Sequence, residues 1–443
     1  MNNPWICLPL AVCMSLAALA QEAPPAAAVV VLPGSTTRLH LDEVVHLALE
    51  RSPGLKGSQA AIRASEHRVA PARALPDPAL ALGWAGKLTP FATMPGDASS
   101  YRGLTVSQQF PYPGKLRLQA EVAAHDVDAA RADCEAARRR IVLDVTLAYA
   151  EYFYLDKAIQ ATRENQELLR QLASLAESQY RVGKAMQQDV LRAQVETSML
   201  TEKLTMLEEQ LGEAQAAINA ALQQAPEAPL PPPEALEAPP LRYSLDELYA
   251  MAGKNDSTIL RNLATIQRGQ ASMALAQRQY RPDIGVSYMF QQRTHQPDMN
   301  GVTVSVNLPV FWKQKQREAV AEAAESLHSA ERMQEEQRNA VRAEVRRQYL
   351  AAQTAQRLLT LSSQAVVLQS SLALESAMAG YRVGKVDFSS VLASFTSVLN
   401  YETGSYRQLA DYNIAVARLE SLTGEPVTNV EQPAPAADQR GAR

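Results

Sequence analysis

The pentapeptide Tyr-Arg-Val-Gly-Lys occurs twice in the chain, at residues 180–184 and again at residues 381–385. The copies begin 381 − 180 = 201 residues apart, close to half of the 443-residue chain. Other short segments recur around them in the same order, namely Leu41-Asp42-Glu43 with Leu245-Asp246-Glu247, Pro76-Asp77 with Pro282-Asp283, and Val106-Ser107 with Val304-Ser305. Self-similarity at a fixed spacing predicts two tandem structural repeats.

The repeats divide the chain into segments. We expect a signal peptide (1–20), an N-terminal extended segment (21–40), repeat 1 (41–224), a proline-rich linker (225–242), repeat 2 (243–426) and a disordered tail (427–443). Lipidation of Cys13 stays open. Removal of the signal peptide would leave Cys134 as the only cysteine, so no internal disulfide is expected.

Each repeat is expected to contain a very long helix. Residues from about Lys313 to Ala379 include no proline and no glycine, and are rich in alanine, glutamate, glutamine, arginine and leucine. The counterpart in repeat 1 runs from about Gly114 to Gln179. At 1.5 Å per residue, such helices span on the order of 100 Å. They need partner helices in a coiled-coil-like wall.

The repeated pentapeptide then marks the tip of a helical hairpin. Glycine after a long helix is typical of a left-handed C-cap, and the basic residues beside it suit the negative helix end. Asp387 is expected to cap the returning helix. The tips are predicted at about 180–188 and 381–389. The cap accounts for the glycine, but it does not account for the identity of the other four residues.

Alternating apolar and polar residues predict two strands in each repeat. They are expected at about 78–87, 103–111, 283–291 and 301–310. One interpretation is an ordinary hairpin covering a soluble core, and the other is a membrane barrel with an apolar outer face. Four strands cannot close a barrel, so a barrel would need several copies of the chain.

Nothing in the sequence predicts catalysis. A net charge of −4 gives no basic face for nucleic acid. The six histidines show neither an i, i+4 pair nor a cysteine partner, and only His295, Asp298 and Met299 suggest a transient metal contact. No phosphate-binding glycine loop or nucleophile elbow occurs. We therefore expect no cofactor, no resident metal and no enzyme activity.

The arrangement resembles the TolC family of outer-membrane efflux factors over nearly the whole chain after the signal peptide. Two segments resemble the CzcC and CusC branch, which works with metal-exporting resistance-nodulation-division (RND) pumps: Leu75-Pro76-Asp77-Pro78 and residues 107–115. The resemblance implies a mainly helical fold and a homotrimer in the outer membrane of a Gram-negative bacterium. Its four strands per chain would join one β-barrel in outer-membrane lipid, and its helices would form a long periplasmic α-barrel.

The same resemblance implies the site residues. The tips would dock a periplasmic adaptor through the residues Arg181, Val182, Gly183, Lys184, Arg382, Val383, Gly384 and Lys385. Tyr381 would constrict the periplasmic entrance, with Asp189 and Asp387 as further gate candidates. Some relatives carry two aspartates where this chain has Ser390 and Ala393, so strong cation selection is not expected.

The function expected from the sequence is a passive exit duct in a tripartite RND-type efflux system, exporting metal ions or small toxic compounds. The alternative is a periplasmic coiled-coil adaptor or scaffold, but an adaptor should contain one helical hairpin with lipoyl and small barrel domains. Within the channel class, drug efflux and type I secretion stay open. The inner-membrane pump would select the cargo.

Overall fold

A computed structural model describes residues 38–87, 93–94 and 96–429 of the chain. The predicted signal peptide lies outside the described residues, as do most of the predicted N-terminal segment and residues 430–443 of the predicted tail. The described part is mainly helical, with four strands in one sheet. This part contains no helix with the length and apolar character needed to span a membrane.

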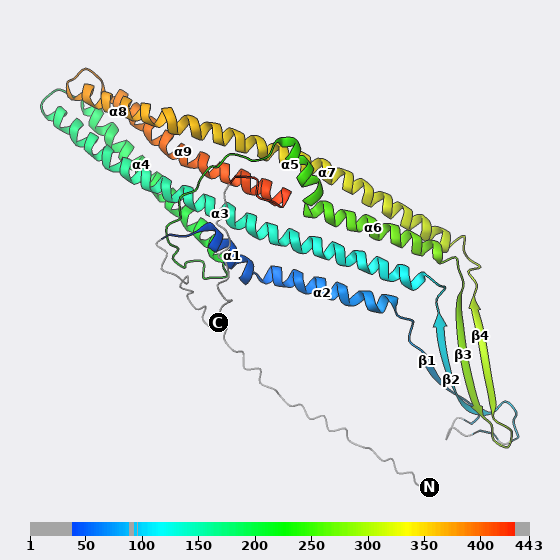
Figure 1. Ribbon diagram of the computed structural model, residues 1–443. Coiled ribbons are helices and arrows are strands. Elements are labelled where there is room, and N and C mark those ends of the chain that lie inside the picture. The colour runs from blue at the N-terminus through cyan, green and yellow to red at the C-terminus, as the bar shows by residue number, and fades with distance from the viewer. Residues whose placement is uncertain (1–37, 88–92, 95, 430–443) are drawn as a thin grey trace, which may run out of the picture. The chain divides into compact units, whose positions relative to one another are not determined.

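Both repeats follow the same order of a short helix, a medium helix, a β-hairpin and a long helical hairpin (Figure 1). Repeat 1 consists of α1 (Leu41–Arg51), α2 (Pro53–Arg73), β1 (Ala79–Ala85), β2 (Tyr101–Phe110), α3 (Lys115–Arg181) and α4 (Gln187–Ala221). Repeat 2 consists of α5 (Leu245–Asn255), α6 (Ser257–Arg278), β3 (Asp283–Gln292), β4 (Met299–Asn307), α7 (Gln316–Leu361), a π-helix (Ser362–Val366), α8 (Val367–Arg382) and α9 (Phe388–Thr423). The predicted fold class, mainly helical with four strands per chain, is confirmed.

Local capping explains where the short helices begin. Ser244 and Glu247 form a capping box at the start of α5, since each side chain bonds the backbone N–H of the other residue. Asp256 caps α6 by accepting a hydrogen bond from the Ile259 N–H at 2.9 Å. The first long helix, α3, then runs unbroken for 67 residues, which corresponds to about 100 Å.

The second long helical segment runs from Gln316 to Arg382, as predicted, but it contains a π-helical turn that the sequence did not predict. This turn, Ser362–Val366, lies between α7 and α8, and the flanking residues Leu361 and Val367 keep right-handed helical angles. Residues 313–379 contain no glycine or proline, so composition offered no signal for the π turn. A π turn accommodates an extra residue, and it therefore rotates the side chains that follow relative to those before it.

The sheet has the order β1-β2-β3-β4, and every neighbouring pair is antiparallel. The β1–β2 and β3–β4 pairs are the hairpins of the two repeats, and β2–β3 pairing joins the repeats. Consequently β1 and β4 are the edge strands of the sheet, each with one row of backbone groups that has no strand partner among the described residues.

Long helices of the two repeats pack together along α3 and α9. The α3 helix packs against α2, α4, α6 and α9, and α9 also packs against α7 and α8. The buried cluster nearest the pentapeptides, which we call the tip core, joins α3, α4, α8 and α9 and includes Leu169, Leu172, Leu374, Phe388 and Phe395. A second cluster joins α5, α7 and α9.

Tyrosine hydroxyls fix the proline-rich linker to the helices. Tyr152 on α3 donates to the Pro231 carbonyl at 3.2 Å, and Tyr412 on α9 donates to the Pro239 carbonyl. The Asn413 amide donates to the Glu237 carbonyl at 3.0 Å. Since proline has no N–H, the linker presents mostly carbonyls, and these hydroxyl and amide donors satisfy them.

The predicted disordered tail does not begin at residue 427. Val427 is fully buried, and its carbonyl accepts a hydrogen bond from the Arg242 N–H at 2.9 Å. Thr428 forms an isolated β-bridge with Leu241. The start of this segment is therefore held against the end of the linker by burial and pairing.

Candidate functional site

The two pentapeptides close the two long helical hairpins, one between α3 and α4 and the other between α8 and α9. Gly183 and Gly384 have φ values of 72° and 74°, the left-handed conformation that glycine adopts without penalty. At the first tip the Lys184 N–H donates to the Gln179 carbonyl at 2.8 Å, and the Gly183 N–H donates to the Tyr180 carbonyl at 2.9 Å. These paired bonds form a Schellman motif.

The second tip repeats that motif. The Lys385 N–H donates to the Gly380 carbonyl at 2.9 Å, and the Gly384 N–H donates to the Tyr381 carbonyl at 3.0 Å. A Cβ added to Gly183 or Gly384 would meet no atom within 4 Å. Each glycine is therefore required by its backbone angle, and the space beside it is open.

All eight residues predicted to dock an adaptor are exposed at these tips. Val182 and Val383 leave 66% and 68% of their surface in solvent, a high value for apolar residues that the chain does not cover. Arg181 is bound within its own helix by Glu177, with 2.9 Å between the guanidinium and the carboxylate. The arrangement offers two basic and apolar loops to a partner.

The tips also lie side by side. The Gln179 amide, at the first tip, donates to the Arg382 carbonyl of the second at 3.4 Å. A depression of about 600 Å³ is lined by residues of both tips, including Lys184, Asp189 and Lys385. The predicted docking residues are therefore brought together on one surface, although about 200 residues separate them in the sequence.

The gate candidates have two different environments. Tyr381 is only 7% exposed, its ring lies 5.5 Å from the Phe388 ring, and its hydroxyl is buried without a hydrogen-bond partner among the described residues. Burial raises the pKa of Tyr381, and the nearby charge of Asp189 raises it further. Tyr381 thus belongs to the tip core of its own chain.

Asp387 caps α9, as the sequence predicted. Its carboxylate accepts hydrogen bonds from the Ser389 hydroxyl and from the Ser390 N–H, the latter at 3.2 Å. Hydrogen bonds from these two serines hold the pKa of Asp387 below its ordinary value. The side chain is therefore used to stabilise the start of the returning helix.

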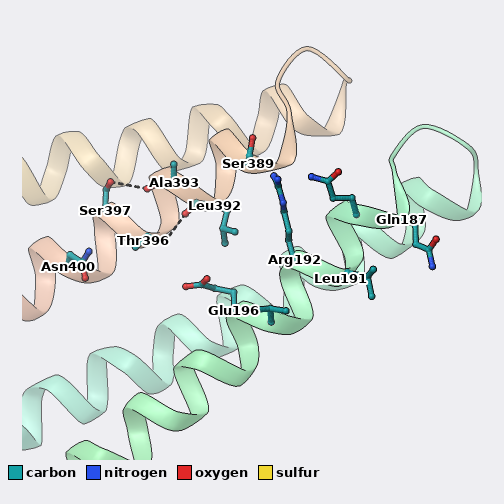
Figure 2. Close-up of a pocket in the computed structure, with 12 residues that line it drawn as sticks. Gln187, Leu191, Arg192, Glu196, Ser389, Leu392, Ala393, Thr396, Ser397 and Asn400 are labelled. Carbon is teal, nitrogen blue, oxygen red and sulfur yellow. Dashed lines mark hydrogen bonds between the residues drawn. The ribbon is translucent and has the colours of Figure 1, made fainter.

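A groove between α4 and α9 was not predicted from the sequence. It has a volume of about 880 Å³, and Figure 2 shows Arg192 extending from α4 toward α9. Leu191 and Val195 on the α4 side are 52% and 60% exposed. The signal that could have revealed it is a row of apolar residues on α4 at helical spacing, which continues to Met199.

Within the part of the chain that the structure describes, no group of three or more His, Cys, Asp or Glu residues could hold a metal ion. His295 has a left-handed backbone, with φ of 64°, in the connection between β3 and β4. Among the described residues, no further His, Cys, Asp or Glu completes a metal site with His295 and Asp298, which with Met299 were the candidate residues.

Comparisons with known proteins bear on both repeats. A family model described as outer membrane efflux protein matches residues 44–224 and 248–425, one segment in each repeat. No curated protein matches the sequence. The structure is also similar to solved outer-membrane proteins.

The outer membrane protein VceC from Vibrio cholerae is 20% identical, with a TM-score of 0.74 over 87% of this chain and 96% of that chain. The CmeC outer membrane channel of Campylobacter jejuni is 14% identical, with a TM-score of 0.74 over 88% and 87%. CusC, described for its transmembrane channel formation, is 14% identical, with a TM-score of 0.74 over 86% and 91%. At these identities the likeness establishes the fold and leaves the branch within the family open.

Proposed function

The chain belongs to the outer membrane efflux protein family, and we propose that it is the outer-membrane duct of a tripartite RND-type efflux system. Its role as an outer-membrane efflux channel follows from the family. The family match in both repeats also removes the periplasmic adaptor alternative. The subunit number, the partners and the cargo are the parts that we propose.

The observation that carries the proposal is the open sheet. In the described part of the chain, β1 and β4 each lack a strand partner on one side, and a sheet with open edges is not tolerated in lipid. Four strands are also too few to enclose a channel. Three copies would supply a closed barrel of strands, continued by a wall of their long helices.

The exposed tips support docking of a periplasmic adaptor. Arg181, Val182, Gly183 and Lys184 repeat in Arg382, Val383, Gly384 and Lys385 with the same backbone cap, so a partner meets nearly the same surface twice in each chain. The open space beside both glycines allows close approach of another backbone. The groove between α4 and α9, whose lining includes the exposed Leu191 and Val195, extends this surface along the hairpins.

The cargo we propose is metal ions or small toxic compounds, with metal favoured by the two branch-typical segments at residues 75–78 and 107–115. The duct itself performs no chemistry. Tyr381, Asp189 and Asp387 lie at the tip end of the helices, where they would shape the entrance. Asp387 would act there chiefly through the cap that it provides for α9.

The proposal is tested by deleting the gene and measuring growth against panels of metal salts and of drugs. We expect sensitivity to one panel, restored by the full-length chain but not by a chain lacking its strands. Fractionation should recover the chain with the outer membrane. Recovery as a soluble periplasmic protein without detergent, or unchanged tolerance of every compound, would contradict it.

A further inference from the structure

At the sheet, the two repeats meet through the β2–β3 pairing and an ion pair whose lysine is buried, a contact that we call the repeat joint. The Lys115 ammonium lies 2.8 Å from the Asp283 carboxylate, and the Lys115 side chain is only 4% exposed. The same carboxylate accepts the Tyr112 N–H at 2.7 Å, and Lys115 also donates to the Arg281 carbonyl at 2.9 Å. This joint fixes the point where the sheet meets the helices.

The β1–β2 and β3–β4 hairpins of the sheet correspond to each other residue by residue. Ala79 pairs with Ser107 in the first hairpin, and Gly285 pairs with Ser305 in the second. Gly285 lies 285 − 79 = 206 residues after Ala79, and Ser305 lies 305 − 107 = 198 residues after Ser107. These two offsets convert every β1–β2 pair into a β3–β4 pair, so positions in one repeat can be transferred to the other.

The free edges of the chain carry the counterparts of the joint residues. Asp77 stands 206 residues before Asp283, and Lys315 stands 200 residues after Lys115 because the connection after Pro309 is two residues longer than the one after Pro111. Both side chains are exposed, and neither makes a hydrogen bond or ion pair with the described residues. The edge at β1 therefore carries an aspartate, and the edge at β4 carries a lysine, which are the two residue types that form the ion pair of the repeat joint.

We propose that β4 of one copy pairs with β1 of the next copy in the register of the repeat joint, and that Lys315 binds Asp77 of the next copy. Val106 of β2 pairs with Tyr288 of β3, and applying the two offsets to this pair places Val304 of β4 opposite Leu82 of β1 in the next copy. Applying them to the pair Gln108–Val286 places Val306 opposite Leu80. The inference rests on the proposed ring of copies, and it adds the residues and the register that join them.

The surfaces that would meet are chemically suited to each other. Leu80 and Leu82 on β1 are 66% and 83% exposed, and Val304 and Val306 on β4 are 63% and 50% exposed. Directly opposed apolar side chains stabilise a pair of strands. A lysine and an aspartate that are both exposed in the single chain would also neutralise each other, as Lys115 and Asp283 do.

Helix packing agrees with this placement. In repeat 1 the long helix α3 packs along both α2 and α6, whereas its counterpart α7 packs along α6 and not along α2 (Figure 1). One side of α7 and one side of α2 are thus left at opposite ends of the row α2-α3-α6-α7. The α2 helix of the next copy would fill the place beside α7 that α6 fills beside α3.

Cysteine cross-linking tests the register in the full chain with Cys134→Ala as background. Directly opposed residues in a sheet lie within the Cα separation that a disulfide requires. After oxidation in outer membranes, the pair Leu82→Cys with Val304→Cys and the pair Leu80→Cys with Val306→Cys should each give covalently linked copies. The pair Leu80→Cys with Val302→Cys, four residues out of register, should give none.

The matched control is Val106→Cys with Tyr288→Cys, the same pair within one chain, which should form a disulfide without any increase in mass. A trimer by native mass spectrometry without cross-linking of either in-register pair would overturn the inference and leave the proposed function standing. Equal cross-linking of the out-of-register pair would overturn it too. Absence of any oligomer would overturn both proposals.

Charge reversal tests the ion pair separately. Asp77→Lys or Lys315→Asp alone should lower the temperature at which the oligomer dissociates in detergent, and the two changes together should restore most of the loss. Lys315→Gln should produce a smaller downward shift than Lys315→Asp, since it removes the attraction without adding repulsion. A double variant that shows the sum of the two single losses would overturn the pairing of Asp77 with Lys315.

Discussion

The two tips of the molecule share five identical residues and the same backbone cap, yet they bury their tyrosines differently. Tyr180 leaves 45% of its surface exposed, whereas Tyr381 leaves 7% exposed. Both glycines have a left-handed backbone, and both hairpins close with the same pair of hydrogen bonds. The pentapeptide therefore determines the backbone of the tip, and residues outside it determine where its tyrosine lies.

The residues that follow the pentapeptide explain the difference. Phe388 stands where the first tip has Gln187, and it supplies a ring against which Tyr381 packs. Asp387 stands where the first tip has Met186, and only Asp387 caps the returning helix with its side chain. The second tip is thus held by a ring contact in the tip core and by a side-chain cap, and the returning helix of the first tip has no side-chain cap.

The residues that flank the pentapeptide also compensate each other in size. The first tip has Gln179 before the pentapeptide and Ala185 after it, whereas the second has Gly380 and Val386. A Cβ on Gly380 would lie 2.5 Å from the Val386 side chain. Each tip accommodates one large and one small residue at these positions, which lets different side chains support the same cap.

The largest expected effect is from Phe388→Ala. Phe388 is 1% exposed, and loss of a buried phenylalanine ring costs about 3–5 kcal/mol. Hydrogen exchange at the tip between α8 and α9 should show a lower free energy of local opening by about this amount. The matched change Gln187→Ala, at the exposed counterpart in the first tip, should stay within about 0.5 kcal/mol. Equal decreases in the free energy of local opening at both tips would contradict the conclusion that Phe388 anchors the second tip.

Gly183→Val and Gly384→Val are expected to have the next largest effect, and a similar one at each tip. A side chain at a left-handed position costs about 1–2 kcal/mol, and more where it is β-branched. We expect reduced export in a growth assay with the oligomer still assembled. Asparagine tolerates this backbone conformation, so Gly183→Asn and Gly384→Asn separate backbone strain from loss of the open space. Full export by both valine variants at normal protein levels would count against docking at the tips.

Asp387 should make the second tip more sensitive to acid than the first. Its folded pKa lies below its unfolded value, so its contribution to stability is complete above about pH 4 and is lost as the pH falls through the folded pKa. Protection factors of the first turn of α9 should fall in that range, while those of α4 change less. Asp387→Asn should keep the cap and abolish this dependence. If the protection factors of Asp387→Asn fall with acid as they do in the unmodified chain, another group is responsible for the acid sensitivity.

The smallest effect is expected from Tyr381→Phe. The Tyr381 hydroxyl is buried without a partner among the described residues, so its removal should leave local opening at the second tip unchanged or make it slightly less favourable. Tyr180→Phe at the exposed counterpart is the control. A loss of about 1 kcal/mol in Tyr381→Phe alone would show that the hydroxyl has a hydrogen-bond partner in the assembled protein.

Local rules allowed much of this to be predicted from the sequence. The glycine caps, the Asp387 cap and the alternating strands each depend on a few neighbouring residues. Internal repetition then predicted how these elements are ordered. The eight docking residues could be proposed from the family resemblance, and the structure adds that the two tips lie side by side.

Features that depend on distant segments could not be predicted. Tyr152 and Tyr412 bind the linker across about 79 and 173 residues, and no local pattern identifies such partners. The groove between α4 and α9 and the burial of Tyr381 arise only when helices of both repeats are packed together. The π-helix at Ser362–Val366 occurs in a segment whose composition favours a regular helix.

We propose that one chain is an incomplete part of an outer-membrane duct, and that other copies complete its two free sheet edges. Native mass spectrometry of the full-length protein, extracted with mild detergent from purified outer membranes, measures the number of copies. We expect a single species containing three copies of the chain. A stable monomer as the only species under these conditions would contradict it.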